Sequence, residues 1–125
     1  MTVEPTLRGQ RILVVEDEYF IATDTARTLR EAGAAVIGPV PSEEAARFRL
    51  ARERPDAAVL DINLGLGASF TLAGSLKERG IPFVFVTGYD QSVIPAAFGG
   101  VERLEKPIQT RRIVGALSKL LMQTA

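Results

Sequence analysis

The sequence predicts a three-layer α/β sandwich built on a parallel β-sheet. Five short apolar runs, rich in Val, Ile and Leu, alternate with segments of helical periodicity along the 125 residues. Strands that are apolar nearly throughout are typical of sheets covered on both faces, and strands separated by helices form parallel sheets through right-handed crossovers. A chain of this length buries roughly two-thirds of its unfolded surface, so we expect one domain that needs no disulfide or structural metal.

The first elements each end at a recognisable boundary. Residues 11–15 are predicted as a buried strand because they are rich in Ile and Val, and the acidic triplet 16–18 follows them. Apolar residues at helical spacing predict a helix over 19–32, which Gly33 terminates. A second strand is expected over 34–40, where nearby prolines close it.

The middle of the chain repeats the alternation of strand and helix. Ser42 is a good N-cap for a helix that continues to about residue 54, and acidic residues in its first turn suit the helix dipole. A third buried strand is expected over 56–62. After a glycine-containing loop, a helix over 69–79 is predicted to stop at Gly80.

The last third supplies two more strands and one long helix. A fourth strand is expected over 81–86, and a short, weak helix could begin at Asp90 or Ser92, limited by a following proline and a Gly-Gly pair. A fifth strand is expected over 101–105. The last helix is predicted over 110–122, where the apolar residues share one face.

Composition excludes several kinds of chemistry. The chain contains neither Cys nor His, which rules out thiol nucleophiles, imidazole bases and Ser-His-Asp triads within it, as well as Cys/His zinc sites. Its 15 basic and 15 acidic residues balance, which argues against a nucleic-acid-binding protein. Apolar runs are far shorter than the ~20 residues that span a bilayer, and residues 1–10 lack the apolar core of a signal peptide. We therefore expect a cytoplasmic protein without membrane insertion, in which residues 1–10 form a loose tail.

Polar residues capable of chemistry lie at or just beyond the predicted strand ends. They are Glu16, Asp17, Asp61, Thr87 and Lys106. The carboxyl ends of the strands of an open α/β sheet form the edge where ligands bind. Carboxylates gathered there repel one another unless a cation lies among them, and oxygen-only ligands suit Mg²⁺. A metal, a lysine and a hydroxyl around a carboxylate nucleophile are the groups that phosphoryl transfer requires.

Over essentially its whole length, the chain resembles the receiver domain of two-component response regulators. The five residues above match the family's motif in order, each at a strand end. On this resemblance, Asp61 is the phospho-acceptor, Thr87 is the switch hydroxyl and Lys106 is the lysine that pairs with the phosphoryl group. Glu16 and Asp17 match the metal-binding acidic pair of the family.

The resemblance also implies features that the residues alone do not give. The sheet would have the flavodoxin-like order 2-1-3-4-5. The ligands implied for Mg²⁺, with Mn²⁺ as a substitute ion, are Glu16, Asp17, Asp61 and the backbone carbonyl of Asn63. The backbone N–H of Gly88 would face the phosphoryl group together with Thr87 and Lys106.

A narrower similarity is to the single-domain receivers of the FATGUY group. It lies in the run PFVFVTGYD over residues 82–90, although Val86 stands in place of that motif's Ala. Ordinary receivers carry a Tyr or Phe three residues before the conserved lysine, whereas this chain has Arg103 there. We hypothesise that Tyr89 takes over part of the missing ring's switching role, with Arg103 as a charged contact for partners.

These features predict a stand-alone receiver over residues 11–122, without an output domain. It would accept a phosphoryl group on Asp61 from a histidine kinase in a Mg²⁺-dependent reaction and lose it by autodephosphorylation, without acting on a separate substrate. Signalling would then pass to a downstream protein or phosphotransfer partner. The switching surface, and a homodimer through it, would involve the fourth helix, the fifth strand and the last helix.

Other interpretations remain open at this point. The chain could be a phosphorylation-independent adaptor, or a phosphate sink or inhibitor of a kinase. A haloacid-dehalogenase-type phosphatase would need a second Asp where Asn63 stands. Each site residue also has an ordinary structural alternative. The pair Glu16–Asp17 could cap a turn, Asp61 could form an Asx-turn, Thr87 could be a turn residue, and Lys106 could be a surface lysine.

Overall fold

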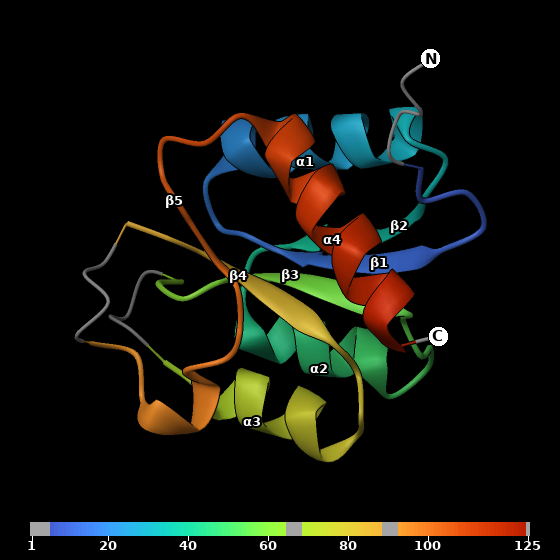
Figure 1. Cartoon of the computed structure of the whole chain (residues 1–125). Helices are drawn as coiled ribbons and strands as arrows, with labels where there is room; N and C mark the ends of the chain where they lie inside the picture. The colour runs from blue at the N-terminus through green and yellow to red at the C-terminus, as the bar shows by residue number, and fades with distance from the viewer. Residues whose placement is uncertain (1–5, 65–68, 89–92, 125) are drawn as a thin grey trace.

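The computed structural model describes residues 6–64, 69–88 and 93–124 and shows a single parallel sheet with helices on both faces (Figure 1). Its strands are β1 (Arg11–Val15), β2 (Ala35–Val40), β3 (Ala57–Asp61), β4 (Phe83–Thr87) and β5 (Arg103–Glu105). They are hydrogen-bonded in the order β2-β1-β3-β4-β5, and every neighbouring pair is parallel. The predicted fold class and the strand order implied by the family resemblance are therefore confirmed.

Helices α1 (Tyr19–Glu31) and α4 (Thr110–Thr124) cover one face of the sheet, and α2 (Glu43–Leu50) and α3 (Thr71–Glu78) cover the other (Figure 1). Alternate side chains of β1 enter different cores because successive strand residues point to opposite faces. Ile12 and Val14 pack in the core beneath α1 and α4, whereas Leu13 and Val15 pack beneath α2 and α3. Among the described helices, none is long and apolar enough to cross a bilayer.

The second helix is shorter than the sequence predicts. Its N-cap is as expected, since the Ser42 hydroxyl accepts the N–H of Ala45 at 3.1 Å. The helix ends at Leu50 instead of continuing to about residue 54, because the Arg52 N–H turns back to the carbonyl of Arg49. This turn lets the following residues reach the start of β3.

In the part that the structure describes, the region of the weak fourth helix includes one short complete element. This element is the 3₁₀ helix η2 (Ala96–Phe98), and the predicted starts at Asp90 and Ser92 lie outside the described residues. Phe98 anchors the turn, because its ring packs against Phe70, Phe83 and Phe85 with centroids 5.9 to 6.2 Å away. Aromatic packing therefore fixes η2 against the domain.

The expectation of a loose tail is wrong for residues 6–10. Leu7 is only 1% exposed and packs in the core beneath α1 and α4, while its N–H donates to the Ala32 carbonyl at 2.8 Å. Gly33 allows this approach: its φ is +99°, and a Cβ there would lie 2.9 Å from the Cα of Arg8. The segment therefore closes the end of α1 and belongs to the domain; residues 1–5 lie outside the described part.

Leu7→Ala is expected to lower the free energy of unfolding by about 2 kcal/mol, which is the low end for a buried leucine. The leucine fills the core, but a segment outside the helices and strands can shift to close part of the cavity. Urea denaturation of both proteins measures the difference. Thr6→Ala, which alters an exposed neighbour, provides the control; a loss for Leu7→Ala no larger than the control's would contradict this packing role.

Candidate functional site

The strand order brings the predicted site residues to one edge of the sheet. Glu16 directly follows β1, Asp61 is the last residue of β3, Thr87 is the last residue of β4, and Lys106 directly follows β5. These strands are consecutive neighbours in the sheet, so their carboxyl ends lie side by side. Short loops and strand pairing hold the backbone of each residue; for example, the Lys106 N–H donates to the Thr87 carbonyl at 2.9 Å.

The ammonium of Lys106 lies at the centre of this edge. Its Nζ donates to Glu16 Oε2 at 3.1 Å, to Asp61 Oδ2 at 3.2 Å and to Glu18 Oε1 at 2.9 Å. The side chains of Glu16 and Asp61 are 5% and 3% exposed, whereas that of Glu18 is 59% exposed. Lys106 is therefore not an ordinary surface lysine: it joins two buried acids to one at the surface.

The two inner acids have raised pKa values because both are buried. Burial, followed by the neighbouring Asp61, raises the pKa of Glu16 to about 7. Burial also raises the pKa of Asp61, although contacts with Glu16, the Asn63 N–H and Lys106 oppose this change. Burial alone would lower the pKa of Lys106, but hydrogen bonds to Glu18 and Glu16 together with the charges of the acids raise it. One ammonium thus faces an excess of carboxylates.

The donor set fits a divalent cation. Glu16, Asp17 and Glu18 can each supply a carboxylate oxygen within 4.8 Å of the others, and the buried Asp61 lies close to Glu16. All of these ligand atoms are oxygens, as Mg²⁺ requires, and buried acids with raised pKa values are stabilised by an added positive charge. Glu16, Asp17 and Asp61 would hold the ion, as the family resemblance implies, together with the carbonyl of Asn63.

Two of the ordinary structural roles considered for the acids, an Asx-turn at Asp61 and a turn bond at Glu16, are present together with the contacts to Lys106. The Asn63 N–H donates to Asp61 Oδ1 at 3.1 Å, so Asp61 does form an Asx-type turn, and the Glu18 N–H donates to Glu16 Oε2 at 3.1 Å. Each acid also accepts a hydrogen bond from Lys106 Nζ, Asp61 through its other oxygen Oδ2 and Glu16 through the same Oε2. The turn bonds therefore orient the carboxylates, and they do not replace a role at the site.

The remaining predicted residues surround this centre. Thr87 is 1% exposed, and Gly88 follows it at the surface. Arg103 is partly buried on β5, paired in register with Phe85 of β4. Tyr89, which we hypothesised as a replacement for the missing aromatic switch, lies outside the described residues.

Glu18 is the contact that the sequence did not single out. It belongs to the predicted acidic triplet, but only the first two members match the family's acidic pair. No local pattern shows that its side chain turns toward a lysine 88 residues away along the chain. The one available signal is its place beside the two acids that match the family's metal-binding pair.

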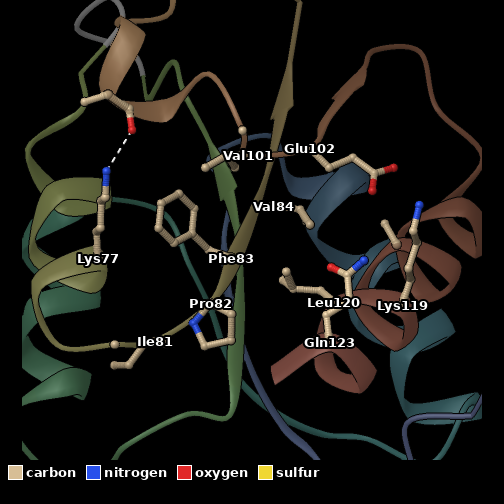
Figure 2. Close-up of a pocket in the computed structure, with 14 residues that line it drawn as sticks. Lys77, Ile81, Pro82, Phe83, Val84, Val101, Glu102, Lys119, Leu120 and Gln123 are labelled. Atoms are coloured by element: carbon tan, nitrogen blue, oxygen red, sulfur yellow. Dashed lines mark hydrogen bonds between the residues drawn. The ribbon is translucent and has the colours of Figure 1, made fainter. Parts of the chain in front are cut away.

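A separate cavity of about 580 Å³ opens near the start of β4, between α3 and α4 (Figure 2). Phe83, Val84 and Val101 contribute apolar lining, and on the α3 side Lys77 Nζ donates to the Ala97 carbonyl at 2.8 Å. Its lining contains none of the acids at the carboxyl ends of the strands. The acidic edge, rather than this cavity, is therefore the candidate site.

Comparisons with known proteins agree with this geometry. A family model described as "Response regulator receiver domain" matches residues 12–118. The sensory transduction protein LytT of Bacillus anthracis is 34% identical over 118 residues, which is 90% of this chain and 48% of LytT. Two-component response regulator PhoP of Pseudomonas aeruginosa is 28% identical over 92% of this chain and 53% of its own length. The chain thus spans about half the length of these curated relatives.

Solved structures give the same result. The solution structure of SdrG from Sphingomonas melonis Fr1 is 35% identical, with a TM-score of 0.77, and the match covers 90% of this chain and 96% of that chain. The BeF3-activated conformation of SdrG from Pseudomonas melonis Fr1 is 34% identical, with a TM-score of 0.76 and coverage of 97% and 99%. The sheet order, the strand-end residues and the family match lead to one conclusion: the chain belongs to the response regulator receiver domain family.

Proposed function

We propose that Asp61 accepts a phosphoryl group from a histidine kinase in a Mg²⁺-dependent reaction. The observation that carries this proposal is the buried Asp61 carboxylate, bonded to Lys106 Nζ at 3.2 Å beside the buried Glu16. Desolvation and like charge make this cluster costly for stability, and such costs are typical of functional sites. An anion-binding lysine next to a carboxylate nucleophile supplies the groups that the reaction needs.

The proposed reaction transfers a phosphoryl group from a histidine of the kinase to Asp61. An oxygen lone pair of Asp61 forms the new O–P bond as the P–N bond of the kinase phosphohistidine breaks, and the electron pair of that bond remains on the imidazole. The bound Mg²⁺ would neutralise charge on the transferring oxygens. Lys106 would pair with the new phosphoryl group, and the hydroxyl of Thr87 and the N–H of Gly88 would donate to it. Water attack at phosphorus later restores the Asp61 carboxylate and releases phosphate.

The proposed output is a change in protein–protein contacts rather than turnover of a separate substrate. Phosphorylation adds a charge of about −1.5 to −2 beside Lys106 and thereby favours a different arrangement of the surrounding loops. β5 and α4 border this site through Lys106, so we propose them, together with η2, as the surface read by a downstream protein or a second copy.

Intact-mass measurement after incubation with acetyl phosphate tests the phospho-acceptor role. The wild-type chain is expected to gain one phosphoryl group when Mg²⁺ is present and none when the metal is chelated. Asp61→Asn should gain none, whereas Asp24→Asn, a change at an acid on α1, should behave as wild type. The same chains are then incubated with phosphorylated histidine kinases.

Two outcomes would overturn the proposal. One is uptake that persists in Asp61→Asn, and the other is failure of both small donors and kinases to phosphorylate the wild type. The second outcome would favour the adaptor without phosphorylation, for which Arg103 in place of the usual ring is the one supporting observation. Unchanged signalling by Asp61→Asn in cells would favour it as well.

A further inference from the structure

Lys106 is fully engaged before any phosphoryl group arrives. A lysine ammonium has three N–H donors. In this structure three carboxylates take them, and the contact with Glu18 Oε1, at 2.9 Å, is shorter than the 3.1 and 3.2 Å contacts with Glu16 and Asp61. A phosphoryl group on Asp61 would take over the contact of that acid, so any further phosphoryl contact with Lys106 must replace Glu16 or Glu18.

The backbone of Glu18 is held in place while its side chain stays accessible. Glu18 is the N-cap residue of α1, yet its side chain makes no capping hydrogen bond and instead reaches Lys106. Its backbone N–H is fixed by Glu16 Oε2 at 3.1 Å. The Glu18 carboxylate is thus directed across the mouth of the site from a fixed point on the backbone.

The free-energy cost of breaking the contact with Lys106 differs among its three partners. Asp61 would carry the phosphoryl group as an acyl phosphate, so its contact with Lys106 passes to that group and leaves no unpaired carboxylate. Glu16 is almost completely buried, and a buried carboxylate that loses its cation remains as an uncompensated charge. Glu18 is 59% exposed, so water can solvate its carboxylate once the lysine leaves. Glu18 is therefore the partner that the phosphoryl group replaces at least cost.

We propose that Glu18 is a positioning residue that holds Lys106 in the unphosphorylated arrangement and competes with the phosphoryl group for it. This inference rests on the proposed function and extends it to a residue outside the family's acidic pair. Removing the charge of Glu18 while keeping its shape should shift Lys106 toward the phosphoryl group. The exposed carboxylate thus sets how strongly phosphorylation changes the site.

Binding of beryllofluoride, a phosphoryl mimic, tests this competition in the presence of Mg²⁺. Affinities are measured by NMR titration of the full chain for the wild type, for Glu18→Gln and for Glu44→Gln, which removes the same charge from an exposed position on α2. Glu18→Gln is expected to bind about fivefold more tightly, the upper value for a pair with one exposed partner. Glu44→Gln should match the wild type.

A second readout separates the lysine contact from a general charge effect. In the metal-free protein, the ammonium protons of Lys106 should exchange with water faster in Glu18→Gln than in the wild type, and Glu44→Gln should leave the exchange unchanged. Affinity within twofold of wild type, weaker binding, or unchanged proton exchange would each overturn the role of Glu18. If the wild type bound no beryllofluoride at all, the proposed function itself would fail. That result differs from the outcomes above, in which the wild type binds beryllofluoride and only the role of Glu18 is overturned.

Discussion

Lys106→Met is expected to lower the free energy of unfolding of the metal-free protein by about 3 kcal/mol near pH 8, as removal of one partner of a buried ion pair does. The ammonium compensates Glu16 and Asp61, which are both buried and lie close enough for each to perturb the other. Methionine keeps an unbranched, largely apolar side chain, so the loss reports charge more than packing. Urea denaturation at several pH values measures the effect.

The loss should shrink as the pH falls. Burial raises the pKa of Glu16 from 4.5 to about 7, and it raises that of Asp61 too. A carboxyl whose pKa is higher in the folded state destabilises the fold above that value, and the penalty disappears below the unfolded value. Without Lys106, the pKa of Glu16 should rise further, so the variant should approach wild-type stability near pH 5.

A double variant provides the control. Adding Asp61→Asn to Lys106→Met removes one of the two unpaired buried charges and should restore part of the stability lost near pH 8. Saturating Mg²⁺ should also reduce the deficit, because the uncompensated acids of the variant should bind the cation more tightly than those of the wild type, and a cation that binds only the folded state stabilises it. An equal deficit at every pH, unaffected by Asp61→Asn, would contradict the electrostatic role assigned to Lys106.

The sequence predicted the layers and the acidic edge because both depend on short-range patterns. Buried parallel strands carry continuous apolar runs, and each run ends where the first polar side chain meets the loop. The order of residues along the chain was thus sufficient to place Glu16, Asp61 and Lys106 at strand ends. The strand order itself came from the family resemblance, since periodicity does not state which strands are neighbours.

The features that were missed depend on contacts between distant segments. Leu7 lies in a short polar stretch that looks like a tail, and only the end of α1, with Gly33, provides the space that buries it. The premature end of α2 arises where the chain turns toward β3. Glu18 is similar: its sequence neighbours indicate an exposed helix start, and its contact with Lys106 forms only after β1 and β5 join the same sheet.

Mg²⁺ is expected to bind roughly two orders of magnitude more weakly near pH 5 than near pH 8, because a proton and the ion compete for Glu16. With a pKa of about 7, Glu16 is mostly ionised at the higher pH, and below its pKa each further pH unit should weaken binding about tenfold. The raised pKa of Asp61 acts in the same direction. Calorimetric titration at constant ionic strength gives the dissociation constants.

Glu16→Gln distinguishes proton competition from a general loss of structure at low pH. This variant lacks the titrating carboxylate while retaining a similar shape, so it should bind Mg²⁺ weakly at every pH and show a much flatter profile. Far-UV circular dichroism at each pH checks that both proteins remain folded. A wild-type affinity that stayed constant between about pH 8 and about pH 6 would mean that Glu16 is not a ligand or that its pKa is not raised. A steep wild-type profile beside a flat variant would instead show that the burial which makes this acid costly to the fold also sets the pH range over which the site can hold its ion.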